Sequence, residues 1–194
     1  MDRAERILID ATRALNAEPA ASTGRIAELI GISRATLHRY FATREALLHA
    51  LGDRAVTRWE RSLDAAGVET AAATGDPARL AATLRALLHA YTADAEEHGF
   101  ALTDHFVLAL PDLVARATVL EDREVAFYTA CQRAGVLRAD LPVRWIAGAV
   151  YGLLVTARDG ARNGDVAPRD LPGLVVDTFL TGAGARPAAR EDTP

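Results

Sequence analysis

The sequence predicts an all-α protein of about nine helices, three in an N-terminal unit and six in a larger body. Apolar residues recur at intervals of three and four along most of the chain, and no stretch alternates apolar with polar residues as a half-buried strand does. Glycine, proline and aspartate interrupt these stripes where helices are expected to begin or end. Half of the 194 residues are hydrophobic and a quarter are charged, which is typical of a globular chain.

The first three helices are expected before residue 44. Residues 2–17 form an amphipathic helix, and a pair of shorter helices follows within residues 22–44. Gly31 ends the first helix of the pair, because glycine accepts the left-handed backbone of a helix C-terminus. The hydroxyl of Ser33 then caps the next helix. The apolar positions that this pair turns inward are Ile26, Ile30, Ile32, Leu37 and Tyr40.

The outward positions of the second helix of the pair suit contact with a nucleic acid. Arginine, threonine and histidine side chains there can reach base edges in a major groove. Hydroxyls, helix N-termini and a guanidinium beside them can hold phosphates. The expected base-reading set is Arg34, Ala35, Thr36, His38 and Arg39; the expected phosphate set is Thr23, Ser33, Tyr40 and Arg44, and Arg25 can join either. An ordinary pair of helices with a glycine-containing corner gives the same short pattern, so both interpretations stay open at this point.

The larger body is expected to hold the remaining helices. Thr43 caps a helix that stops at Gly67, Asp76 caps one with Pro77 at its first position, and a turn is expected at residues 163–164. The predicted helices cover about residues 44–66, 76–99, 100–108, 111–135, 141–162 and 169–180. Residues 185–194 are expected to form a disordered tail.

The last two predicted helices carry matching apolar stripes. Such stripes are expected to meet those of a second copy in a two-fold four-helix bundle, and Gly148 and Gly152 form a second row that permits close helix approach. The alternative is that both helices only cover the core of their own protomer. The stripe residues are Ile146, Ala149, Val150, Leu153 and Ala157 on one helix and Leu171, Leu174, Val175, Thr178 and Phe179 on the other.

Charge and composition exclude several function classes. The net charge is −4, but the first 50 residues carry seven arginines against six acids, so the acidity belongs to the rest of the chain. No lysine is present, which excludes a P-loop lysine and a lysine Schiff base. Cys131 is the single cysteine and suits a reducing cytoplasm. The first residues lack the apolar core of a signal peptide, and the apolar run at 145–155 is too short to span a bilayer, so no membrane partner is expected.

From about Arg3 to Leu51 the chain resembles the N-terminal domain of the tetracycline-repressor (TetR) family of transcription regulators. The matching segments are Arg-Ile-Leu-Ile-Asp-Ala, Ile-Ala-Glu-Leu-Ile-Gly-Ile-Ser, Ala-Thr-Leu-His-Arg-Tyr-Phe and Thr-Arg-Glu-Ala-Leu-Leu. His38, Arg39 and Arg44 depart from the family's usual residues. The resemblance implies a helix-turn-helix DNA-binding domain over residues 1–50 and a ligand-binding and dimerisation domain over residues 51–184. It also implies a homodimer on a palindromic double-stranded operator, most often as a repressor that a small molecule releases.

The resemblance further implies a small-molecule pocket in the body, without identifying the effector. Aromatic and polar residues between the head and the last two helices could line it, although each aromatic is individually at least as suited to the core. The candidates are Trp59, His89, Tyr91, Phe100, Asp104, His105, Phe127, Tyr128, Cys131, Trp145 and Tyr151. The histidines, Asp104 and Cys131 share no metal-ligand spacing, so neither a metal nor another cofactor is expected.

Two other function classes compete with a cytoplasmic DNA-binding regulator. One is a helical enzyme, but the sequence contains no HExxH, Gly-x-Ser-x-Gly or Gly-x-Gly-x-x-Gly motif. The other is a protein-interaction module whose helix pair does not bind DNA. A steep loss of DNA affinity with salt distinguishes the regulator from both, because phosphate contacts release counterions.

Overall fold

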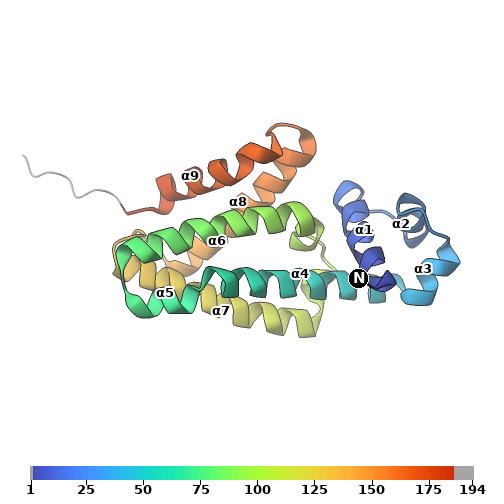
Figure 1. Ribbon diagram of the computed structural model, residues 1–194, viewed down its shortest axis with the longest axis horizontal. Helices are drawn as coiled ribbons and strands as arrows, with labels where there is room; N and C mark the ends of the chain where they lie inside the picture. Colours follow the sequence, from blue (N-terminus) through green and yellow to red (C-terminus); the bar gives the residue numbers. More distant parts are fainter. Residues whose placement is uncertain (1, 186–194) are drawn as a thin grey trace, which may run out of the picture.

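The computed structural model describes residues 2–185, which form nine α-helices and three short 3₁₀ turns. A small three-helix head lies at one end of an elongated body, and helix α4 leaves the head and runs along the body (Figure 1). The head consists of α1 (Arg3–Ala17), α2 (Thr23–Leu29) and α3 (Arg34–Tyr40), and the body of α4 (Arg44–Ala66), α5 (Val68–Thr74), α6 (Pro77–His98), α7 (Pro111–Arg133), α8 (Val143–Asn163) and α9 (Leu171–Ala183).

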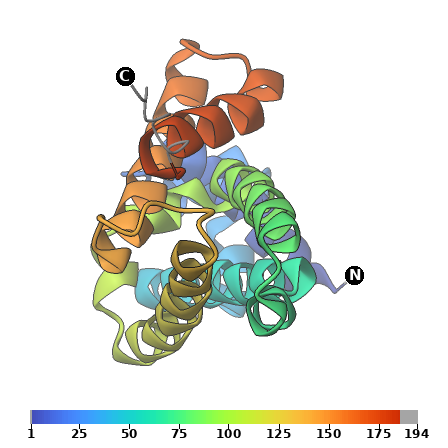
Figure 2. The ribbon, with the colours of Figure 1, turned by 90° about the vertical axis from the view of Figure 1, so that its left-hand side faces the viewer.

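The body is a bundle of long helices with α8 and α9 on one flank. Helix α6 packs against α4, α8 and α9, and α7 packs against α4, α5 and α8. Seen along the body, α9 lies on the outer side, away from α5 and α7 (Figure 2). Between α6 and α7 the chain makes η1 (Gly99–Leu102) and η2 (Val107–Ala109), and η3 (Pro168–Asp170) precedes α9.

The expected all-α architecture is confirmed, and most predicted helix ends fall where the capping residues indicate. Gly31 has φ 71°, the Ser33 Oγ accepts the Thr36 amide at 3.0 Å, and the Thr43 Oγ1 accepts the Ala46 amide at 3.0 Å. Asp76 caps α6 by accepting the amide of Arg79 at 3.0 Å. Sequence spacing and local polar chemistry therefore determine these ends together.

Two segments differ from the prediction. Residues 68–74 form helix α5, which the sequence analysis did not predict. Gly67, with φ 67°, ends α4, and α5 begins at the next residue. Residues 100–108 do not form one helix but the turns η1 and η2. The carboxylate of Asp104 lies between them and accepts the amides of Phe106 and Val107, both at 3.0 Å, which favours a turn over a continuous helix.

Two hydrophobic cores meet along α4. Leu47, Leu48 and Leu51 belong to the core of the head, Leu63 belongs to the core of the body, and Val56 packs against both. The head core also includes Phe100 from η1 and three further residues of the body: Ala101, Val107 and Leu113. The expected boundary near residue 50 thus passes through a continuous helix that serves both cores. In the described part of the chain, no helix is long and apolar enough to cross a membrane.

Candidate nucleic-acid interface and internal cavity

Helix α3 presents one buried and one exposed face. Leu37 is fully buried at 0% exposure and anchors the helix in the head core, where Tyr40 packs partly buried. Arg34, Ala35, His38 and Arg39 are exposed, and Thr36 is half-buried. The predicted base-reading residues therefore lie on the solvent side of a short helix whose other side is fixed by packing.

Neighbouring groups organise the side chains on this face. A Cβ built at the buried Gly24 would lie 3.0 Å from Nε of Arg34, so this glycine leaves room for the Arg34 side chain to lie over α2. The Arg39 guanidinium carbon lies 5.4 Å from the ring centroid of Tyr40, within the range of a cation–π contact. Oγ of Ser33 and Oγ1 of Thr36 lie 2.9 Å apart. These contacts restrict side chains that would otherwise be free in solvent.

The flanking candidates occupy different environments. Thr23 is half-buried at the first position of α2. Arg25 is exposed and forms ion pairs with Glu18 at 2.8 Å and with Glu28 at 3.5 Å, so its charge is partly neutralised within the head. Nη1 of the half-buried Arg44 donates to the carbonyl of Ala21, which ties the start of α4 to the loop before α2. Arg44 therefore has a structural contact as well as a position beside α3.

A cavity of about 540 Å³ lies in the body, and residues that adjoin the head, such as Gly52, Ala101 and Val107, form part of its wall. Its walls come from α4, α6, α7, α8, η1 and η2, and most of them are apolar. Trp59, Tyr91 and Tyr151 line it, as expected for three of the predicted pocket residues. Tyr151 also donates from its hydroxyl to the carbonyl of Leu102 at 2.6 Å, which joins α8 to η1.

The other predicted pocket residues lie elsewhere. Phe127, Tyr128 and Cys131 are buried in the body core, where the two aromatic rings pack 5.8 Å apart, and Phe100 is buried in the head core. Large apolar side chains on buried helix faces fill the core rather than leave a void. The remaining four are Asp104, which caps a turn, and the exposed His89, His105 and Trp145, the last of these 68% exposed.

Sequence reasoning missed Glu124, the most buried carboxyl in the wall of the cavity. It is only 7% exposed, and its Oε1 accepts from Nε1 of Trp59 at 3.0 Å and from the hydroxyl of Tyr91. Burial raises the pKa of this carboxyl from 4.5 to about 7, against the opposing effect of both hydrogen bonds. Its spacing from Leu120 and Phe127 on the buried face of α7 was the signal that could have identified it.

The predicted dimer stripes pack largely inside the protomer. Ile146, Val150 and Phe179 belong to the body core, and Ala157, Leu171 and Val175 form a small cluster that Leu153 also contacts. Ala149 is half-buried, whereas Leu174, at 50% exposure, and Thr178 are exposed. The face that the protomer leaves exposed therefore comprises Gly148, Gly152 and the predicted stripe residues Leu174 and Thr178, because most of the other stripe residues cover the core of the protomer.

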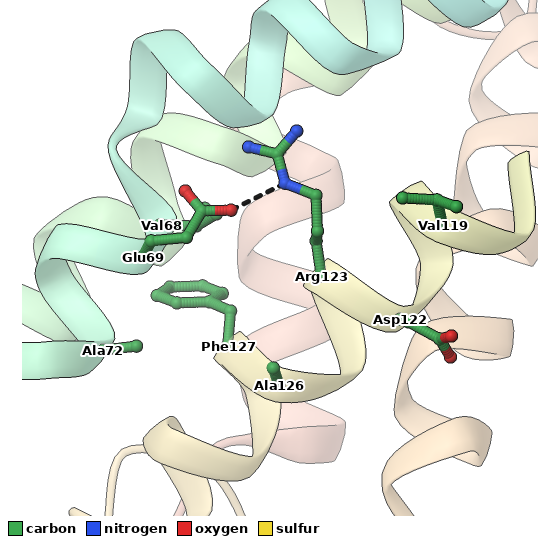
Figure 3. Close-up of a pocket in the computed structure, with 8 residues that line it drawn as sticks. All are labelled: Val68, Glu69, Ala72, Val119, Asp122, Arg123, Ala126 and Phe127. Carbon is green, nitrogen blue, oxygen red and sulfur yellow. Dashed lines mark hydrogen bonds and ion pairs between the residues drawn. The ribbon is translucent and has the colours of Figure 1, made fainter. Parts of the chain in front are cut away.

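A second, shallower depression lies between α5 and α7. Phe127 is the one predicted pocket residue in its lining, so the depression does not bring the predicted residues together. Arg123 reaches across it to Glu69, with Nε to Oε1 at 2.6 Å, and Phe127 and Ala72 form its apolar floor (Figure 3). Arg123 also pairs with Asp64 at 2.6 Å. The arrangement is a salt bridge that joins two helices over a packed aromatic ring.

Known proteins are similar to this chain in sequence and fold. Residues 8–51 match the family described as bacterial regulatory proteins, tetR family. The HTH-type transcriptional repressor LfrR of Mycolicibacterium smegmatis is 28% identical over 181 residues, which cover 93% of this chain and 88% of that protein.

Solved structures align over nearly the whole chain. LfrR from Mycobacterium smegmatis in complex with proflavine aligns with a TM-score of 0.65 and 24% identity, over 96% of this chain and 100% of that one. AibR in complex with isovaleryl coenzyme A and operator DNA aligns with a TM-score of 0.68 and 18% identity, over 92% and 98% of the two chains. At these identities the structural likeness establishes the fold.

A three-helix head with an exposed, basic second helix in its turn motif, matched over residues 8–51 to a family of bacterial regulatory proteins, is the arrangement of a DNA-binding transcription regulator. Over residues 8–51 the chain matches the TetR family of bacterial regulatory proteins.

Proposed function

We propose that this protein is a ligand-responsive transcriptional repressor that binds a palindromic operator as a homodimer in the bacterial cytoplasm and is released by a small molecule. The exposed polar face of α3, set on the buried Leu37, is the observation that carries the proposal. The repressor name of LfrR supports it, as do the proflavine in one LfrR structure and the operator DNA and isovaleryl coenzyme A in the AibR structure.

Helix α3 enters the major groove in this proposal. Arg34, Ala35, Thr36, His38 and Arg39 meet base edges, since their side chains lie on the outer face and first turns of the helix. The phosphates on either side are held by hydroxyls, by amides at helix N-termini and by a guanidinium. The residues in these roles are Thr23, Ser33, Tyr40 and Arg44, with Arg25 available once DNA competes for its ion pairs.

Dimerisation uses the outer face of α8 and α9. A Cβ at Gly148, Gly152, Gly173 or Gly182 would meet no atom within 4 Å, so the packing of the protomer itself does not require glycine at these positions. Glycine in a helix interior costs about 1 kcal/mol relative to alanine. Close approach of the same helices from a second copy gives these glycines a function, and a two-fold axis then presents two heads to two half-sites.

Ligand binding reaches the head by two structural connections. The cavity wall includes Gly52, Val56 and Trp59 of α4, and α4 continues into the head core. The wall also includes Ala101 of η1 beside the end of α6, where Asn16 of α1 donates to the carbonyls of Glu96 and Glu97 at 3.1 and 2.7 Å and accepts the Phe100 amide at 2.9 Å. A ligand that prefers one spacing of the heads shifts the population toward it.

Fluorescence anisotropy with labelled duplexes from the DNA flanking the gene tests the proposal. We expect affinity to fall steeply with salt, and Arg44→Ala to weaken binding to every duplex and reduce the slope of log K against log salt by about one. Changes at Arg34 or Thr36 should instead alter the preferred sequence. Arg85→Ala, which removes an exposed arginine of the body, is the matched control and should bind as wild type. If Arg44→Ala and Tyr40→Phe both bind the operator as wild type, the proposed contacts are wrong.

A further inference from the structure

The charges that line the cavity are unequally neutralised. Asp94 is paired with Arg58 and also accepts from the Ser62 hydroxyl, and Glu121 is paired with Arg144 at 2.8 Å. Glu124 has no basic partner within the described part of the chain. It is therefore the one carboxyl of this wall whose ionised form lacks a counter-charge among the described residues.

The geometry of Glu124 leaves part of the carboxyl available to a ligand. Both hydrogen bonds that the described residues make to it end at Oε1, from the indole of Trp59 and the hydroxyl of Tyr91. Oε2 keeps its lone pairs, and the residue lines the cavity. The two donors also fix the side chain, so the carboxyl needs no reorganisation when a ligand arrives.

The aromatic side chains around the carboxyl restrict the ligand further. Trp59 and Tyr91 both contact Glu124, and Tyr151 lines the same cavity from α8. Aromatic faces attract cations, and a cavity of about 540 Å³ lies in the range that encloses a drug-sized ligand. The ionised form of the carboxyl repels an anion and attracts a cation.

We infer that the cavity takes a planar aromatic cation, whose positive charge lies against Oε2 of Glu124. The inference rests on the proposed function in one respect, namely that this cavity is the effector site. It adds the chemical class of the effector and the residue that selects it.

Proton release accompanies this binding. The free carboxyl has a pKa raised to about 7 by burial, and a cation against it favours the ionised form. Affinity for a permanently charged ligand should therefore increase as pH rises through 7. The groups that face Glu124 are Trp59 of α4, Tyr91 of α6, Glu121 and Tyr128 of its own helix, and Arg144 of α8 through Glu121.

The other ionisable groups of the wall do not explain such a pH dependence. Burial raises the pKa of the Tyr91 and Tyr128 hydroxyls well above their usual value, so both remain neutral. Burial lowers the pKa of His98, so the imidazole favours its neutral form. A change in affinity between pH 6 and 8 that disappears in Glu124→Gln is therefore assigned to Glu124 rather than to His98.

Direct binding of two matched probes to the full chain tests the inference. The probes are 10-methylacridinium, whose charge does not titrate, and acridine at pH 8, which has the same ring system without the charge. Probe fluorescence is titrated with protein in the absence of DNA, because planar cations also bind duplexes. We expect 10-methylacridinium to bind about tenfold more tightly at pH 8 than at pH 6, as one proton with a pKa near 7 requires.

Two variants separate the carboxyl from the rest of the cavity. Glu124→Gln keeps an oxygen acceptor for Trp59 and Tyr91, and should weaken 10-methylacridinium binding at pH 8 roughly 10- to 100-fold, abolish its pH dependence and leave acridine binding within about twofold. Glu60→Gln removes a carboxylate that lies on α4 beside Trp59 but does not line the cavity, and should bind both probes as wild type.

Several outcomes would overturn the inference. They are no saturable binding of 10-methylacridinium, equal binding of this cation by wild type and Glu124→Gln at pH 8, and an affinity of wild type for this cation that does not increase from pH 6 to pH 8. Operator binding is measured separately on the same preparations without probe. Its loss would contradict the proposed regulator and leave the cation result standing, and the reverse also holds.

Discussion

Replacing Gly148 and Gly152 together by alanine should stabilise the protomer and weaken the dimer. Both glycines are exposed within α8, and an added Cβ at either meets no atom of the protomer within 4 Å. Alanine is favoured over glycine by about 1 kcal/mol in a helix interior, so the double variant should gain about 2 kcal/mol in the free energy of protomer unfolding. A two-fold axis places four added methyl groups between the helices of the two copies. Overpacking of this kind costs about 1–3 kcal/mol, which raises the dimer dissociation constant about 5- to 150-fold.

Two measurements separate these opposite effects. Sedimentation equilibrium gives the dissociation constant, and urea unfolding at protein concentrations below that constant gives the stability of the protomer. Gly160→Ala is the matched control on the same helix, since its added Cβ would make only an ordinary 3.6 Å contact with Val166. It should raise stability without changing dissociation. A double variant that dissociates with the wild-type constant would refute the assignment of this face to the dimer.

Three further outcomes follow from the head and the cavity. Leu37→Ala, at a position with 0% exposure, should lower the unfolding free energy of the head by about 2–5 kcal/mol and abolish operator binding while the dimer persists in sedimentation. Asn16→Ala should lower the free energy of unfolding in urea by about 1–2 kcal/mol and speed hydrogen exchange at the Phe100 amide. Water can replace the bonds of Asn16 to the exposed carbonyls of Glu96 and Glu97 better than its part-buried bond to the Phe100 amide. Unchanged exchange at that amide would contradict the α1–α6 connection. Glu124 has a folded pKa of about 7 against 4.5 unfolded, so the folded state holds a proton that the unfolded chain releases, and stability should fall by about 3 kcal/mol as pH rises through this window. Urea unfolding at pH 5 and pH 8 should show this loss in wild type and not in Glu124→Gln; an equal loss in both would assign it to other groups.

The head was predictable because its residues satisfy local rules and packing at once. Gly31 adopts the left-handed backbone, Ser33 caps α3, and Leu37 lies inside with Arg34 and Arg39 outside. Each expectation depended on neighbours within a few positions in the chain. The family resemblance covered the same segment, so both arguments pointed to one arrangement.

The cavity was less predictable because its wall comes from distant segments. Trp59, Tyr91 and Tyr151 were expected there and line it, but Phe127 and Tyr128, equally aromatic, fill the core. Spacing along a single helix does not distinguish these two fates, since Tyr91 in the cavity wall and Tyr128 in the core both lie on buried helix faces. Glu124 was not among the sequence candidates, although its position between Leu120 and Phe127 placed a carboxyl on an apolar face.

The prediction of the dimer interface on the last two helices had a similar limit. The apolar stripe of α8 was clear from the sequence, but Ile146 and Val150 on it pack against their own protomer. An apolar stripe states that a face is buried and does not state by which molecule. The exposed glycines beside it give the more informative signal, because nothing in the protomer requires them.

The core of the head is completed by residues from beyond α4, among them Phe100, Val107 and Leu113. Chimeric biosensors that graft the reading head of one regulator onto the sensing half of another would, at a joint near residue 50, sever this shared core. A graft of this protein should carry the 100–113 segment together with residues 2–51, or replace both sides of that contact as a matched set.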